Sequence, residues 1–184
     1  MKKRGAWKIH SSKEILDTPV FKVWVDNSES PRNGKKGHFY RFKCGGWVNI
    51  IAVTARKKIV MIRQFRHGNK KWEIEIPGGL IDKSDSDPLH AGQRELLEET
   101  GFKGENARLI GAVCPNPALQ DNICHTVLVE NARKVSGPAM EDCEDIETML
   151  VSPEKAMKLI RDGKITHGLV LNALMFYFME CKML

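Results

Sequence analysis

The segment from Pro77 to Phe102, PGGLIDKSDSDPLHAGQRELLEETGF, restricts the fold more than any other part of this sequence. It opens with two glycines and continues into a clearly marked helix. Asp87 can cap the first turn of that helix, Pro88 suits its first position, and Gly101 suits its exit. A helix is therefore expected over residues 88–100, after a β-rich stretch that ends at the glycines.

The rest of the chain reads as many strands with few helices. Residues 6–43 are expected to form short strands and turns, because β-rich segments such as VFKVWVD flank the polar stretch NSESPRNGKKG. Further strands are expected at WVNIIAV, KIVMIRQF, KWEIEI, 107–113, 123–130 and 146–151, and further helices at SPEKAMKLIRDG and from Thr166 to Cys181. This order predicts an α/β fold, with a mixed sheet between helical layers. The β-rich beginning predicts a small separate unit, which divides the chain into 1–45 and 46–184.

Composition narrows the class of protein without naming a partner. A chain of 184 residues with 42% hydrophobic and 28% charged residues is typical of a soluble globular protein. The formal charge of +6 is compatible with a nucleotide, a nucleic acid or an anionic lipid. Five scattered cysteines without a CxxC pair favour free thiols in a reducing compartment. The longest apolar run, GLVLNALMFYFM, is too short to cross a bilayer, so a cytoplasmic location and no membrane partner are expected.

Three glutamates, Glu95, Glu98 and Glu99, share one face of the expected helix, because residues three and four apart are neighbours. One interpretation is a solvated face on which Arg94 pairs with Glu98. The preceding double glycine favours another, since glycine lets the backbone approach a ligand or cation closely. Several carboxylates and a carbonyl oxygen are the ligands that Mg²⁺ or Mn²⁺ prefers. Such a cluster could polarise a phosphoryl group and activate water.

These residues resemble the Nudix box, whose pattern is G-x5-E-x7-R-E-U-x-E-E-x-G-U, where U is aliphatic or aromatic. The segment RELLEETGF matches the second half at every position. The first half departs from the pattern, because Gly79 and Arg94 are separated by one residue more than it allows, in DKSDSD. No glutamate stands at the loop position, and Asp85 is the nearest acidic substitute.

The resemblance extends to the nucleoside-diphosphate-sugar branch of that family, typified by ADP-ribose pyrophosphatases. IRQFRHG and WEIEIPGGLID before the box, Pro117 after it, and CEDIETMLVSPEKAMKLIRDGKITHGLVLNALMFY near the end of the chain carry the likeness. It implies a Nudix-type α/β/α sandwich with a mixed sheet, preceded by a small N-terminal β unit. It also implies Mg²⁺-dependent hydrolysis, with Mn²⁺ as an alternative ion, of a nucleotide sugar to a nucleoside monophosphate and a sugar phosphate. ADP-ribose is the first candidate and GDP-mannose-type sugars remain open. A homodimer formed through the N-terminal strands is expected.

The resemblance assigns roles to the helix and the glycine loop. Glu95 and Glu99 correspond to metal ligands, and the carbonyl of Gly78 adds another. Glu98 corresponds to a supporting carboxylate. Arg94 would orient the glutamates from behind.

The resemblance also implies that the base that activates water lies in a loop before a late strand, which here is the acidic stretch AMEDCEDIE. Glu141, Asp142 and Glu144 are candidates, and a plain acidic surface turn is the alternative. By its register against EDI, Asp142 is expected to be the base and Glu144 an additional metal ligand.

Four residues are expected to contact the substrate. Arg66 resembles an arginine that holds a substrate phosphate, although it could be an ordinary surface arginine. Glu75 is assigned to the site by resemblance. Phe21 is a candidate for stacking on the base, although core packing is the favoured alternative. Pro117 is first of all a turn residue and secondly a candidate for a wall of the substrate site.

Two other functions remain open. An RNA 5′-pyrophosphohydrolase would suit the basic charge, but no tract of interleaved basic and aromatic residues is evident, so a nucleic-acid partner is not expected. A nucleotide-sugar sensor that binds without cleaving would be expected to lack the glutamates, and all three are present.

Overall fold

The computed structural model describes residues 5–139 and 145–183. Contacts divide the chain into two compact units, one of Met1–Gly45 with Cys114–Asn122 and one of Gly46–Val113 with Ile123–Leu184. Nothing in the sequence pattern assigns Cys114–Asn122 to the first unit. The roles predicted for the two parts, dimerisation and catalysis, stay predictions.

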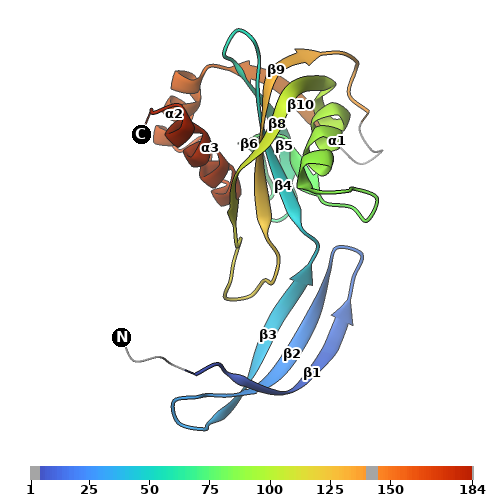
Figure 1. The fold of residues 1–184 in the computed structure, drawn as a ribbon, viewed down its shortest axis with the longest axis vertical. Coiled ribbons are helices and arrows are strands. Elements are labelled where there is room, and N and C mark those ends of the chain that lie inside the picture. The colour runs from blue at the N-terminus through green and yellow to red at the C-terminus, as the bar shows by residue number, and fades with distance from the viewer. Residues whose placement is uncertain (1–4, 140–144, 184) are drawn as a thin grey trace. The chain divides into compact units, whose positions relative to one another are not determined.

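The smaller unit is an antiparallel sheet of three strands, β1 (Lys8–Asp17), β2 (Phe21–Glu29) and β3 (Lys36–Cys44) (Figure 1). Its interior is polar. Asp26 is buried and accepts hydrogen bonds from Arg41, at 2.8 Å, and from Ser12. No hydrophobic side chain of this unit is buried among the residues that the structure describes. A sheet this small therefore stands without an apolar core of its own.

The larger unit is built on a seven-stranded mixed sheet. Its main path runs β10 (Ile146–Val151), β5 (Ile59–Arg66), β4 (Trp47–Val53), β9 (Cys124–Lys134) and β8 (Phe102–Val113). β6 (Lys71–Glu75) pairs with β5, and the short β7 (Gly78–Leu80) pairs with β4. β4 and β9 are parallel, whereas the other pairs are antiparallel. The predicted mixed sheet is confirmed.

Among the described residues, three helices cover the two faces of this sheet (Figure 1). α1 (Pro88–Thr100) lies on one face, and α2 (Pro153–Arg161) and α3 (Gly168–Glu180) lie on the other. Alternation along β4 explains the two cores, because successive side chains point to opposite faces. Ile50 packs in the core that contains Leu96 of α1, and its neighbour Ile51 packs in the core that contains Leu174 of α3. The predicted α/β/α sandwich is confirmed.

β8 and β9 are longer than expected, and β7 was not expected. β8 begins at Phe102, not near residue 107, and its pairing with β9 carries three register shifts. Such irregularities break the alternation that marks a strand in sequence, so its first half was not recognisable. β7 was not expected, because glycine weakens a strand; here its pairing with β4 overrides that preference.

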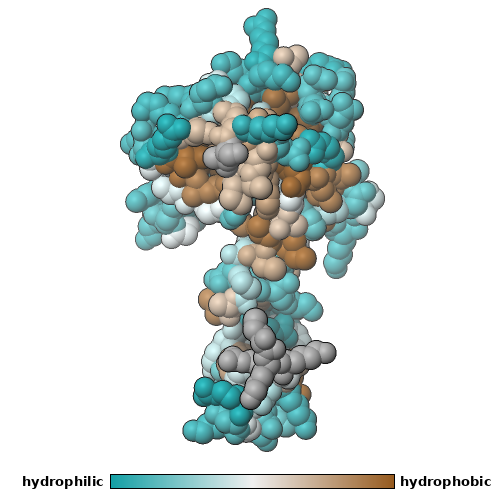
Figure 2. Space-filling model, turned by 60° about the vertical axis from the view of Figure 1, so that its left-hand side comes forward, coloured by the Kyte–Doolittle hydropathy of each residue, from teal (hydrophilic) through white to brown (hydrophobic). Residues whose placement is uncertain are grey.

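The surface of the larger unit mixes apolar and polar residues. Figure 2 shows hydrophobic residues reaching the surface of this unit, framed by hydrophilic ones. In the described part of the chain, no helix has both the length and the apolar character needed to cross a membrane.

Candidate active site

Local signals hold α1 in the register that the site requires. The Oδ1 of Asp87 accepts hydrogen bonds from the backbone N–H groups of Leu89 and His90, both at 2.9 Å. Pro88 occupies the first turn, and Gly101 ends the helix with a φ of 71°. A left-handed residue at this position is usually glycine, because a Cβ is strained there. Both predicted ends of the helix are confirmed.

The glycine loop meets the helix at two glutamates. The N–H of Gly78 donates to Oε2 of Glu99 at 3.1 Å, and Glu99 is only 4% exposed. A Cβ on Gly78 would lie 2.5 Å from the carbonyl oxygen of Val48, and one on Gly79 would lie 2.5 Å from Oε1 of Glu95. Glycine at position 78 therefore lets the loop approach β4, and glycine at position 79 lets it approach the helix.

Arg94 links the glutamates to one another and to the loop. Its Nη1 donates to Oε1 of Glu95 and to Oε2 of Glu98, both at 2.9 Å, and its Nη2 donates to the carbonyl of Leu80 at 3.0 Å. A hydrogen bond to Asp85, followed by those to the two glutamates, raises the pKa of Arg94. The contact expected for a solvated helix face, Arg94 with Glu98, is present, but it belongs to a larger network.

Asp85 completes this network from the lengthened loop. Its side chain is fully buried, and its carboxylate accepts hydrogen bonds from Nε and Nη2 of Arg94 at 3.2 and 2.9 Å. It also accepts the N–H of Asp82 at 2.9 Å and contacts Nδ1 of His90 at 2.8 Å. The hydrogen bond from Arg94 is the main reason why the pKa of Asp85 lies well below its usual range. The loop, one residue longer than in the pattern, thus places an aspartate, Asp85, against Arg94 where the pattern has a glutamate.

The donor chemistry at this site fits a hard divalent cation. Carboxylates and a backbone carbonyl beside a glycine loop are ligands that Mg²⁺ and Mn²⁺ accept. Within residues 5–139 and 145–183, however, no three acidic, histidine or cysteine side chains are grouped closely enough to hold a metal. Glu98 is 45% exposed and Glu95 15% exposed, which favours Glu95 over Glu98 as a ligand. The predicted ligands Glu95, Glu99 and Gly78 stay predictions.

A second buried acid organises the residues expected to contact substrate. Glu75 is 2% exposed, and its carboxylate accepts Nε and Nη2 of Arg66 at 2.8 and 2.7 Å in a fork. The same carboxylate contacts Nδ1 of His167 at 3.1 Å. Burial raises the pKa of Glu75, but hydrogen bonds from Arg66 and then His167 outweigh it and lower the pKa to about 2. Arg66 and Glu75 are therefore neighbours, and Glu75 lies behind Arg66 with almost no surface of its own.

The structure places two of the remaining predicted residues and does not describe the other two. Phe21 and Pro117 belong to the smaller unit, where the ring of Phe21 packs edge-to-face on Phe42 at 5.3 Å. Asp142 and Glu144 fall outside the described residues. Their predicted roles stay predictions.

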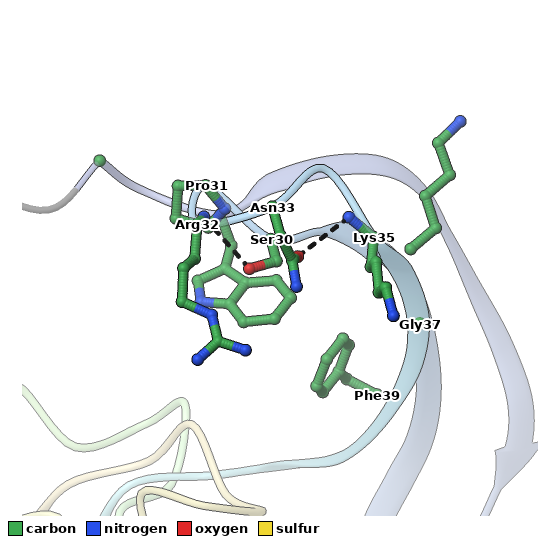
Figure 3. A pocket seen from close by; sticks show the side chains of 10 residues that line it. Ser30, Pro31, Arg32, Asn33, Lys35, Gly37 and Phe39 are labelled. Carbon is green, nitrogen blue, oxygen red and sulfur yellow. Dashed lines mark hydrogen bonds between the residues drawn. The ribbon is translucent and has the colours of Figure 1, made fainter.

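The smaller unit also contains a hollow that the sequence did not suggest (Figure 3). It has a volume of about 510 Å³ and lies beside the turn between β2 and β3. Trp7 and Phe39 line it and contact each other edge-to-face at 5.1 Å. Arg32, Lys35 and Lys36 line it as well. The basic turn next to exposed aromatic residues was the signal that could have revealed it.

The family of this chain follows from its match to a known domain. The family model described as the NUDIX domain matches residues 47–173, which span the seven-stranded sheet, α1, α2 and the first part of α3. The chain belongs to the Nudix family. The predicted resemblance to this family is confirmed.

Individual Nudix relatives agree with this assignment. An ADP-ribose pyrophosphatase of Bacillus subtilis (strain 168) is 31% identical over 159 residues, which cover 86% of this chain and 85% of that protein. A GDP-mannose pyrophosphatase of Escherichia coli O139:H28 is 32% identical over 143 residues, which cover 71% of this chain and 73% of that protein. A crystal structure described as an ADP compounds hydrolase shares the fold, with a TM-score of 0.86 and 19% sequence identity. The match covers 99% of this chain and 97% of that chain. This Nudix protein is a hydrolase that acts on a pyrophosphate bond.

Proposed function

We infer that the protein hydrolyses nucleoside-diphosphate sugars in the presence of Mg²⁺, releasing a nucleoside monophosphate and a sugar phosphate. ADP-ribose is the first candidate, and GDP-mannose-type sugars are the next. The observation that carries this proposal is the meeting of Glu95 and Glu99 with the glycine loop, in the same unit as the fork of Arg66 on Glu75. The names of the relatives support the same class of substrate.

The residues of the chain have distinct parts in this function. Glu95 and Glu99 would hold the cation, with the carbonyl of Gly78. When bound, the cation polarises the phosphoryl oxygens and lowers the pKa of water. Arg94 keeps the carboxylate of Glu95 in place through a 2.9 Å hydrogen bond. Arg66, oriented by Glu75, presents guanidinium N–H groups that suit a phosphate oxygen.

The water and its base complete the proposed reaction. Asp142 is the proposed base and Glu144 the proposed additional ligand, both in the late acidic stretch. A base must lie within hydrogen-bond reach of the water whose proton it takes.

Phe21 of the smaller unit is the proposed residue for stacking on the nucleotide base, and packing against Phe42 is the alternative. We expect Phe21→Ala to raise KM for a nucleotide sugar, because stacking on a base contributes about 1–3 kcal/mol. Steady-state kinetics measures the change, and an unchanged KM would mean that Phe21 serves packing only.

A substrate panel with Mg²⁺ or Mn²⁺ tests the proposed function. Products are identified by mass spectrometry. ADP-ribose should yield AMP and ribose 5-phosphate. Pyrophosphate from 5′-triphosphorylated RNA, with no nucleoside monophosphate from any nucleotide sugar, would overturn the proposal.

The hollow between Trp7 and Phe39, with its cationic lining, favours RNA as the second candidate substrate. The salt dependence of binding distinguishes RNA from a nucleotide sugar as the substrate. RNA binding through many phosphates weakens steeply as salt rises, because each contact releases counterions. KM for a compact nucleotide sugar should change far less between low and moderate salt. All three box glutamates are present, which favours hydrolysis over a sensor that only binds.

A further inference from the structure

Arg66, Glu75 and His167 form a cluster that joins three separate parts of the larger unit. Arg66 ends β5, Glu75 ends β6, and His167 stands immediately before the first residue of α3. Oε2 of Glu75 is shared, because Arg66 Nη2 lies 2.7 Å from it and His167 Nδ1 lies 3.1 Å from it. Glu75 is 2% exposed, whereas the side chains of Arg66 and His167 are 41% and 38% exposed. Glu75 is therefore the buried residue of the cluster, and the side chains of Arg66 and His167 are each partly exposed to solvent.

The contact with Glu75 sets the proton positions on His167. An ionised carboxylate has only acceptor oxygens, so a hydrogen bond to it requires a proton on Nδ1 of the imidazole. In the neutral ring, Nε2 then carries a lone pair and accepts hydrogen bonds. The cluster thus presents a guanidinium that donates and an imidazole nitrogen that accepts, both held by one buried acid.

The start of α3 is linked to the glycine loop through β4. Asn49 of β4 pairs with Gly78 across the sheet, and Gly78 donates to Glu99. The Nδ2 of Asn49 donates to the carbonyl of Leu169, two residues after His167, at 3.1 Å. Glu75 also stands three residues before Gly78 on the same short segment. His167 therefore belongs to the set of contacts that surrounds the glycine loop.

We propose that His167 is a specificity-determining residue, whose Nε2 accepts a hydrogen bond from a sugar hydroxyl beside a phosphate held by Arg66. This rests on the proposed function. A second phosphate oxygen offers Nε2 only another acceptor, whereas a hydroxyl offers it a donor. The pair is therefore complementary to a phosphate with a polyhydroxyl sugar attached, and it discriminates against a diphosphate that ends in an alkyl group. Glu75 is the positioning residue that holds Arg66 and His167.

Equilibrium binding tests this proposal independently of turnover. Dissociation constants for ADP-ribose and for the P²-ethyl ester of ADP are measured by calorimetry, with Ca²⁺ in place of Mg²⁺, for the wild type and three variants. His167→Ala removes the whole ring. His167→Asn keeps an amide N–H near the position of Nδ1, for Glu75, but has no group at the position of Nε2. Thr166→Val is the matched control, because Thr166 Oγ1 donates to Glu73 at 2.9 Å and so ties the same loop to β6.

The measured quantity is the preference for ADP-ribose over the ethyl ester. His167→Ala and His167→Asn should each reduce this preference by about tenfold, which is the upper end of the net contribution of one neutral hydrogen bond. Thr166→Val should leave it unchanged. A preference retained in His167→Asn, or lost in Thr166→Val, would show that His167 only supports the fold there and would overturn the proposal. A wild type that cleaves no nucleotide sugar with Mg²⁺, with a preference that the His167 variants lose, would overturn the proposed function and support the binding role of His167.

Discussion

At the scale of single residues, burial separates the three box glutamates that sequence alone treats as equals. Glu99 is 4% exposed and receives the N–H of Gly78, whereas the side chain of Glu98 is 45% exposed and pairs with Arg94. Surface ion pairs contribute little to stability or positioning, whereas a buried carboxylate is kept charged only by its surroundings or a cation. Glu99 is therefore the residue whose loss should matter most to chemistry.

We predict that Glu99→Gln lowers kcat by on the order of 10²-fold or more, because a carboxamide is a poor ligand for a hard cation. Glu98→Gln is the matched comparison on the same helix, and its effect should be smaller. Steady-state kinetics at saturating Mg²⁺, with circular dichroism to confirm folding, measures both. An unchanged kcat in Glu99→Gln would exclude it as a ligand.

Glu75 should also give the protein a specific pH dependence of stability. Its folded pKa of about 2 lies below its ordinary value of 4.5, so the ionised form is the one that the fold favours. The stabilisation is present above pH 4.5 and is lost as pH falls toward 2. At neutral pH it amounts to about 3 kcal/mol, since one pKa unit corresponds to about 1.4 kcal/mol.

The free energy of unfolding of wild type and Glu75→Gln, measured with denaturant at several pH values, tests this dependence. The difference between the two proteins should be largest at pH 6 and should shrink steadily below pH 4.5. A difference that stays constant down to pH 3 would mean that the Arg66 and His167 contacts do not favour the ionised acid.

At the scale of elements, the loop before α1 shows how a departure from a family pattern is accommodated. Asp85 stands six residues after Gly79, where the pattern has its glutamate, and the additional residue follows it. The extra length and the shorter acid compensate each other, because Asp85 is fully buried against Arg94. Restoring only the longer acid or only the shorter loop should therefore destabilise the protein more than restoring both.

We predict that Asp85→Glu alone destabilises the protein, because one more methylene must fit a filled site; overpacking typically costs about 1–3 kcal/mol. Asp85→Glu combined with deletion of Ser86 restores the spacing of the pattern and should recover most of the stability and kcat. Thermal unfolding and kinetics of both variants provide the measurement. If the double change is as damaging as the single one, length and side chain are not coupled.

At the scale of the whole molecule, the smaller unit points to an assembly. In the part of the chain that the structure describes, its hydrophobic side chains are not buried. Several large ones are well exposed, namely Trp7, Ile9, Ile15, Leu16, Val20, Phe39 and Tyr40. Exposed apolar patches on a small sheet usually mark an interface, because a three-stranded sheet needs an apolar face to be stable.

We predict a homodimer in solution through this sheet. Ile9→Glu combined with Leu16→Glu should convert it to a monomer, because both residues are at least 50% exposed and a charge there would be costly to bury. Leu150→Glu, at a comparably exposed position in the larger unit, should leave the dimer intact. Light scattering coupled to size exclusion gives the masses, and a monomeric wild type would contradict the prediction.

Much of the fold and part of the site could be predicted from local sequence signals. The ends of α1 were predictable because Asp87, Pro88 and Gly101 act on backbone groups within a few residues of themselves. The strands of the central sheet were predictable because buried β-strands contain short continuous apolar runs, as in Ile59–Ile62. The box glutamates were visible because helical spacing places them on one face.

What the sequence alone determined is thus the local structure and the chemical type of the site, while the tertiary structure decided which partners meet. Glu75 and His167 are 92 positions apart, and only the packing of α3 against the sheet makes them neighbours. The same holds for Asp85, whose role depends on the path of its loop, and for Cys114–Asn122, which joins a unit far from it in sequence. Contacts between distant segments leave no periodic or capping signal, because they follow from the burial of whole faces rather than from neighbouring residues.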